Sequence, residues 1–242
     1  MTDCVNRDGT LRTLVSVLKS ADNCSPAMSE ALDALACLSR SEGANGHIKP
    51  AWVVLAELPD SITPIVLCIA DATPLLQDKA IEILSLLCRA QPIVLGNAVA
   101  SASGCISAVA ERVISTSAAR VKIGGAALLV CTAKVNHQKV VEDLNASTLC
   151  TRLVQSLVGM LSSVQFCHLE NQRGKGAISI CRNIKEEASK GEVEKNTTAI
   201  YGVNIAIWLL SALASRDEKS KIETVEAGAV EILTEKISQS LS

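Results

Sequence analysis

The sequence predicts an all-α protein built from repeated helices. Hydrophobic residues make up 48% of the 242 residues, yet only two Trp, one Tyr and one Phe are among them. A core of Ala, Leu, Ile and Val favours closely packed helices over sheets, whose strands use aromatic and β-branched residues. Helical start signals followed by apolar residues at helical spacing are the second observation, and a repeat of about 44 residues is the third.

Four long amphipathic helices are predicted, beginning near residues 26, 73, 117 and 197. Ser25, Thr73 and Ser117 stand where the N-caps of the first three are expected. A proline follows the first two caps at the first helical position, where its missing N–H costs nothing. The fourth helix, residues 199–214, is apolar nearly all round and should be largely buried. The first helix carries its apolar face on Leu32, Leu35, Ala36 and Cys37.

Two further kinds of helix are predicted between the long ones, always in the same order. A short kind begins near Pro92, Asn136 and Asp217, at spacings of 44 and 81 residues. A third kind begins near residues 61, 103, 146 and 228, at spacings of 42, 43 and 82, and the long helices follow at 47, 44 and 80. The three series share one period and one interruption. The sequence therefore predicts an armadillo/HEAT-like right-handed α-solenoid of about five repeats.

The interruption falls at residues 165–196, which are rich in charge. Glu170 to Asn196 contain six Lys or Arg and five Asp or Glu, with few large apolar residues. Such a segment cannot bury enough surface to offset the entropy of ordering. We therefore expect armadillo-type repeats over 1–164, a flexible, disordered insertion over 165–196, and a repeat that continues the array over 197–242.

The two ends of the chain indicate a stretch of a longer array. The chain opens on a helix of the third kind, Thr10–Lys19, and closes near Ser238 without a polar capping unit. An autonomous protein with atypical end repeats is the alternative. Near the end, Gly228 is expected at a sharp turn between two helices, where a left-handed backbone favours glycine.

Ten cysteines do not indicate disulfides or a metal site here. No two of them are closer than 13 residues, and no CxxC occurs. Cys37, Cys68, Cys88 and Cys131 lie in apolar helical stretches, where a reduced thiol acts as a small hydrophobic residue. The N-terminus lacks the apolar segment of a secretory signal, so a reducing, cytoplasmic setting is expected. No stretch approaches the roughly 18 uninterrupted apolar residues of a membrane helix, so we expect no direct membrane insertion.

Charge and motifs argue against a nucleic-acid binder and against an enzyme. The formal net charge is −2, so no nucleic-acid partner is expected. His47, His137 and His168 lie in separate polar segments, and no zinc-protease, nucleophile-elbow or phosphate-loop motif occurs. Cys167, His168 and Cys181 have the spacing of no common zinc site and lack a fourth ligand.

The remaining candidates have simple structural interpretations. Gly124-Gly125 lies in an apolar helical run and indicates close helix packing rather than a phosphate cradle. Glu142-Asp143 and Glu186-Glu187 lie in polar stretches where nothing would raise a pKa for general-acid chemistry. Gly174-Lys175-Gly176 is a basic spot in the insertion. We expect no catalytic, cofactor-binding or metal-binding residues and no cofactor.

Four stretches of the chain resemble the plant cellulose synthase-interactive proteins: residues 49–96, 121–145, 153–161 and 200–238. The resemblance implies an internal part of a long armadillo array that, in the family, ends in a C2 domain absent here. It implies a non-enzymatic scaffold that bridges cellulose synthase complexes and cortical microtubules, guiding cellulose microfibril deposition and anisotropic cell growth. The implied partners are cellulose synthase catalytic subunits and microtubules. The implied location is cytoplasmic, at cortical microtubules and the inner face of the plasma membrane.

A generic armadillo adaptor, such as the substrate-binding part of a plant ubiquitin ligase, is the alternative function. A nuclear-import receptor is disfavoured, because its repeats present Trp followed one turn later by Asn. Here Ala56 follows Trp52 and Ala212 follows Trp208 at that spacing. The near-neutral charge also indicates a spacer more than a surface that grips the acidic microtubule.

Overall fold

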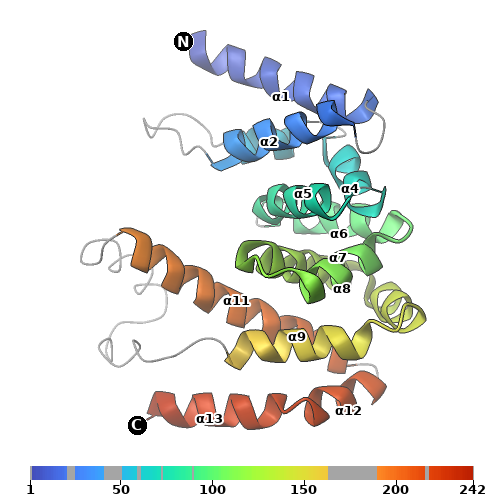
Figure 1. The fold of residues 1–242 in the computed structure, drawn as a ribbon, viewed down its shortest axis with the longest axis vertical. Coiled ribbons are helices and arrows are strands. Elements are labelled where there is room, and N and C mark those ends of the chain that lie inside the picture. Colours follow the sequence, from blue (N-terminus) through green and yellow to red (C-terminus); the bar gives the residue numbers. More distant parts are fainter. Residues whose placement is uncertain are drawn as a thin grey trace. The chain divides into compact units, whose positions relative to one another are not determined.

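All regular structure in the described part of the chain is α-helical (Figure 1). The computed structural model describes residues 2–20, 25–40, 51–58, 61–71, 73–88, 90–162, 190–215 and 218–241. They belong to two compact units, residues 1–150 and 151–242. The predicted all-α fold of solenoid type is confirmed, while the number of repeats stays a prediction.

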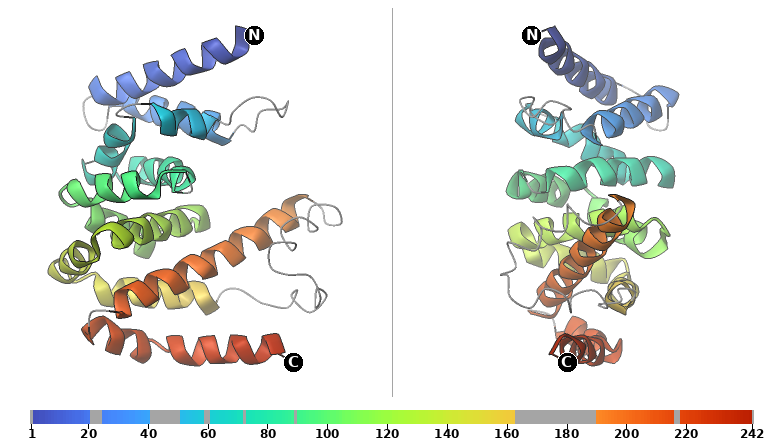
Figure 2. Two further views of the ribbon diagram at one scale, coloured as in Figure 1. Left: turned by 180° about the vertical axis from the view of Figure 1, so that it is seen from behind. Right: turned by 90° about the vertical axis from the view of Figure 1, so that its left-hand side faces the viewer.

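The N-terminal unit is a stack of helices of the three predicted kinds. Its helices are α1 (Thr2–Ser20), α2 (Pro26–Arg40), α3 (Ala51–Glu57), α4 (Ile62–Asp71), α5 (Pro74–Leu87), α6 (Pro92–Ser101), α7 (Cys105–Ser115) and α8 (Ala119–Ala146). Long helices α2, α5 and α8 pack on one another in turn, and Figure 2 shows the successive layers. Helices α6 and α7 both pack on α8, as α4 packs on α5. Helix α1 begins eight residues before the predicted start.

The helix starts show which predicted caps form. Ser25 is confirmed as a cap, because its Oγ accepts the Met28 N–H at 3.2 Å. Thr73 occupies the N-cap position of α5 without a side-chain cap hydrogen bond. Ser117 is wrong as the cap of α8, since the N-cap is Ala118 and the Thr116 hydroxyl accepts its N–H at 3.1 Å. The hydrogen bond to Thr116 moves the helix start by one residue.

Helix α8 consists of two helices joined at Asn136. The backbone of Asn136 is non-helical, with φ −143° and ψ 77°. Its Oδ1 accepts the Lys139 N–H at 3.1 Å, so the side chain caps the second half of α8. The short helix predicted to begin near Asn136 is thereby confirmed.

The C-terminal unit contains the next helices of the same kinds. They are α9 (Cys150–Ser162), α11 (Lys190–Ala214), α12 (Glu218–Glu226) and α13 (Ala229–Leu241). Within this unit α11 packs on α12 and α12 on α13, and the Thr151 hydroxyl donates to the Glu223 carboxylate at 2.7 Å, joining α9 to α12. Residues 151–162, which the sequence placed with the first segment, belong to this unit.

Helix α11 begins earlier than predicted, and it leaves part of its surface exposed. Residues 190–196, predicted as the end of the insertion, are its first two turns, whereas 163–189 lie outside the described residues. One face of α11 is buried through Val203, Ala206 and Leu209. The helix is largely buried as predicted, but Trp208 on the opposite face is 60% exposed.

Three residues with a left-handed backbone occupy equivalent turns before helices of the third kind. They are Gly104 with φ 74°, Thr148 with φ 55° and Gly228 with φ 80°, before α7, α9 and α13. The left-handed turn predicted at Gly228 is confirmed. At Thr148 the Leu149 N–H donates to the Leu144 carbonyl at 3.0 Å, which closes the end of α8. A β-branched residue is strained here, because its Cβ crowds the following carbonyl.

Replacing Thr148 by glycine is expected to stabilise the N-terminal unit. Thr148→Gly relieves the left-handed strain and should raise the free energy of unfolding by about 1 kcal/mol. Gly104→Ala is the reverse test: its added Cβ meets nothing within 4 Å, so the backbone alone should cost about 1 kcal/mol. Urea unfolding followed by circular dichroism measures both. If Thr148→Gly and the wild type have the same free energy of unfolding, the backbone at Thr148 is not strained.

Three glycines let the helices around α8 approach closely. A Cβ on Gly96 of α6 would lie 2.5 Å from the Cys131 carbonyl oxygen of α8. A Cβ on Gly124 would lie 2.9 Å from Ser85 Cβ of α5, and one on Gly125 would lie 2.6 Å from Val113 Cγ2 of α7. Close packing at Gly124-Gly125 is therefore confirmed, and each member of the pair faces a different helix.

Alanine at these glycines is expected to destabilise the protein, although alanine is the better helix former. Gly96→Ala and Gly125→Ala should each cost about 1–3 kcal/mol through overpacking, since backbone and β-branched side chains have little room to move. Gly159→Ala on the exposed side of α9 is the matched control. Its Cβ meets nothing within 4 Å, so a gain of up to about 1 kcal/mol in urea unfolding is expected. Equal effects at all three positions would refute close approach.

Candidate functional site

The carboxylates singled out from the sequence in the described part of the chain, Glu142 and Asp143, each have a partner on their own helix. In the second half of α8, Lys139 Nζ donates to Asp143 Oδ1 at 3.0 Å, and Gln138 Nε2 donates to Glu142 Oε1 at 2.7 Å. Both are contacts between residues four apart on one helix face. His137 is half-buried beside them. Each of these carboxylates therefore has a hydrogen-bond partner on its own helix face.

The described residues hold no group of three or more His, Cys, Asp or Glu placed to bind a metal ion. Several sequence candidates lie outside these residues: His47, Cys167, His168, Gly174-Lys175-Gly176, Cys181 and Glu186-Glu187. The structure therefore brings no predicted catalytic or ligating groups together in the part of the chain that it describes.

The six cysteines whose side chains the structure describes are free thiols. Cys68, Cys88 and Cys131 are buried, as their apolar surroundings predicted. Cys37 is exposed, so the prediction that it joins the apolar face of α2 is wrong. Leu32, Leu35 and Ala36 carry that face, and the side chain of Cys37 follows about 100° further round the helix.

Cys88 and Cys131 are buried cysteines on α5 and α8, two helices that pack on each other. Cys88 is the C-cap of α5, and Cys131 lies inside α8. Hydrogen bonding with Cys88 lowers the pKa of the Cys131 thiol, burial raises it, and the Lys134 charge on α8 lowers it again. The net effect is a pKa for Cys131 below its ordinary value. The sequence did not reveal the pair, because its members are 43 residues apart.

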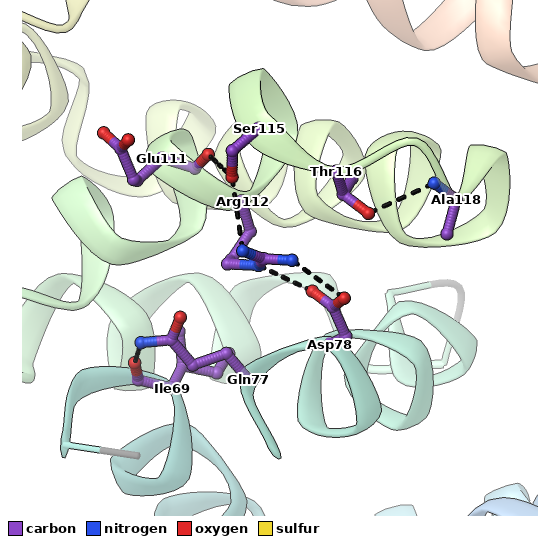
Figure 3. Close-up of polar contacts among 8 residues, drawn as sticks. All are labelled: Ile69, Gln77, Asp78, Glu111, Arg112, Ser115, Thr116 and Ala118. Atoms are coloured by element: carbon purple, nitrogen blue, oxygen red, sulfur yellow. Dashed lines mark hydrogen bonds and ion pairs between the residues drawn. The ribbon is translucent and has the colours of Figure 1, made fainter. Parts of the chain in front are cut away.

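A largely buried ion pair joins α5 to α7. Arg112 Nε and Nη2 donate to the two carboxylate oxygens of Asp78 at 2.7 and 2.9 Å, and these side chains are 15% and 22% exposed (Figure 3). Arg112 Nη1 also donates to Ser115 Oγ at 3.2 Å. These two parallel hydrogen bonds fix the relative direction of α5 and α7 as well as the distance between them.

Further polar contacts connect other helices of the N-terminal unit. Lys79 Nζ on α5 donates to Asp33 Oδ2 on α2 at 2.8 Å and to Ser29 Oγ at 3.0 Å. Gln91 Nε2, at the start of α6, donates to the Ala56 carbonyl at the end of α3 at 2.6 Å. Equivalent helices are thus joined across a separation of 35 to 50 residues. These side chains orient neighbouring helices, and the exposed surface around them carries both signs of charge.

No single helix among the described residues is both long and apolar enough to cross a membrane. Only α6 and α7 taken together pass that test of length and composition, and they meet at a bend of 104°. Leu95 of α6 and Val109 of α7 are fully buried, whereas Ile93 and Val94 in the first turn of α6 are 67% and 51% exposed.

The fold and these contacts define a class first: an all-α protein of stacked, recurring helices. The chain is 34% identical over 230 residues to Protein CELLULOSE SYNTHASE INTERACTIVE 3 of Arabidopsis thaliana, and 32% identical over 233 residues to Protein CELLULOSE SYNTHASE INTERACTIVE 2. The matches cover 94% and 95% of this chain but 11% of each relative. The resemblance found in the sequence is confirmed, and the chain corresponds to a small part of these proteins. No family model and no solved structure matches it.

The ion pair between α5 and α7 is expected to contribute measurably to stability. Asp78→Asn leaves the half-buried Arg112 guanidinium without a charged acceptor, which should cost about 1.5–3 kcal/mol. Lys221→Gln is the control, because Lys221 and its partner Glu218 are 54% and 78% exposed. Its effect should stay below about 0.5 kcal/mol in the same urea unfolding experiment. Similar losses for the two variants would contradict the role of burial.

Proposed function

We propose that the chain is a non-enzymatic span of a scaffold that bridges cellulose synthase complexes and cortical microtubules. One observation carries the proposal: similarity along 94–95% of the chain to two proteins that are named for interaction with cellulose synthase. Through this bridge the scaffold would guide cellulose microfibril deposition and anisotropic cell growth. It would act in the cytoplasm, at cortical microtubules and the inner face of the plasma membrane.

The described structure supports a mechanical role for this span. Long helices packed in sequence, close approaches at glycines and ion pairs between successive helices make a body that resists deformation. A scaffold must hold its partners at defined positions, so rigidity is its main requirement. Stacked helices also present an extended surface on which a partner can lie.

The charge of this segment supports contact with cellulose synthase rather than with the microtubule. Its formal net charge is −2, and its interhelical cations Lys79 and Arg112 are already paired with carboxylates. Binding to the acidic surface of a microtubule relies on clusters of Lys and Arg. We therefore propose that this segment contacts cellulose synthase catalytic subunits and serves as a spacer with respect to microtubules.

Two binding assays on the purified chain test the proposal. Immobilised chain should retain the recombinant cytosolic domain of a cellulose synthase catalytic subunit, whereas the same amount of an unrelated armadillo protein should not. In a sedimentation assay with stabilised microtubules, the chain should stay in the supernatant at physiological salt. Failure to retain the synthase domain would overturn the contact, and salt-sensitive pelleting with microtubules would overturn the spacer role.

A further inference from the structure

We propose that α13, together with α12, forms a docking surface that receives the long helix of a further repeat. In Figures 1 and 2 these two helices form the outermost layer of the C-terminal unit. Helix α13 packs on α12, and no helix follows α13 among the described residues. This docking is independent of any contact with cellulose synthase.

An apolar position that is buried in two earlier helices of the third kind is exposed in α13. The left-handed residues before α7, α9 and α13 align the three helices. The second position after the left-handed residue is Ile106 in α7, Cys150 in α9 and Val230 in α13. The exposed fractions of these side chains are 0%, 3% and 51%. The side of α13 that carries Val230 is therefore open.

The fifth position shows the same difference, and the N-terminal unit shows what covers it there. Val109 of α7 and Leu153 of α9 are fully buried, whereas Leu233 of α13 is only half-buried. A Cβ on Gly125 of α8 would lie 3.5 Å from Val109 Cγ1, so the long helix α8 covers this position of α7. Helix α4 packs in the same order on the long helix α5. A long helix is therefore the element that fits the open side of α13.

Helix α12 extends the exposed apolar surface. Ile222 and Val225 are 54% and 52% exposed and lie about one turn apart on one helix face. The aligned positions of α6 are Ala98 and Ser101, so the larger apolar side chains are a feature of α12. Exposed apolar residues that are grouped in this way mark an interaction surface. The docking surface consists of Ile222, Val225, Val230 and Leu233.

Acidic side chains border the docking surface and select the chemistry of its partner. Glu226, Glu231 and Glu235 are exposed on the same two helices. A two-fold contact between two copies of the chain would bring these like charges together, which is unfavourable. A helix with Lys or Arg beside its apolar face is complementary instead. Helix α8, which covers α7, carries Arg120 and Lys122 in its first turn.

The length of the relatives supports a repeat of the same protein as the occupant. The matched region is 11% of each Arabidopsis relative, so these proteins contain much more chain than the region described here. A repeat in a stack of helices buries its apolar face only against its neighbours. The burial, the charge and this length together assign the docking surface to a further repeat rather than to a second copy.

Hydroxyl-radical footprinting of the unmutated protein tests the docking surface. The chain is compared with an extended chain, which carries at its C-terminus the segment of about 45 residues, one repeat, that follows the matched region in Protein CELLULOSE SYNTHASE INTERACTIVE 3. Trypsin releases the docking surface as residues 222–236. Modification of this peptide should fall about threefold in the extended chain, because its exposed side chains become covered. Residues 90–112, which contain the exposed Ile93 and Val94, should be modified equally in both.

Two variants of the extended chain show whether Val230 is needed for docking. Val230 and Val94 are both 51% exposed, so they are matched in residue type and in exposure. Val230→Asp should return the modification of residues 222–236 to its rate in the unextended chain, because covering a carboxylate with apolar groups is costly. Val94→Asp should leave the modification low.

Two results would overturn the inference. One is an equal footprint of residues 222–236 in both chains: whether the added repeat is unfolded or folds elsewhere, the docking surface then stays open. The other is a footprint of the unextended chain that weakens as its concentration rises, which would assign the surface to a second copy. Neither result bears on retention of the cellulose synthase domain, so the two proposals fail separately.

Discussion

The N-terminal unit depends on how closely three helices approach α8. Gly96, Gly124 and Gly125 remove the side chains that would otherwise separate α6, α5 and α7 from it. With these helices in contact, the apolar residues of α8 from Ile123 to Ala133 are nearly all buried. Dispersion contacts add up only when atoms are within a few tenths of an ångström of their best separation, so close approach decides the packing energy. Small residues at helix contacts also explain how a core almost without aromatics is dense.

The polar contacts follow from the same packing. Once α5 and α7 are held near α8, Asp78 and Arg112 come within reach, and their parallel hydrogen bonds fix the relative direction of the helices. Lys79 does the same toward α2. Side chains used in this way are less available for external charged ligands.

Local features were predictable because they depend on a few neighbouring residues. Ser25 caps a helix, Asn136 starts one inside a longer helical run, and Gly228 takes a left-handed turn, all as their residue types indicate. The apolar residues at helical spacing also identified Leu32, Leu35 and Ala36 as the buried face of α2. Thr148 escaped prediction, because a β-branched residue is a poor candidate for a left-handed turn. The need for a left-handed backbone at residue 148 is revealed only by its equivalence to Gly104 and Gly228, which precede the other helices of the third kind.

The sequence by itself determined the helical class, the order of the three kinds of helix and the absence of any recognised catalytic motif. Apolar periodicity and capping residues are local properties of the sequence. Their recurrence at a fixed period strengthens the prediction of repeated helices. Tertiary structure decided which helices touch, and that Cys37 is exposed while Cys131 is buried. It also decided that one face of α11 leaves Trp208 exposed. These outcomes depend on the distance and rotation between helices, which long-range packing sets and no short window of sequence contains.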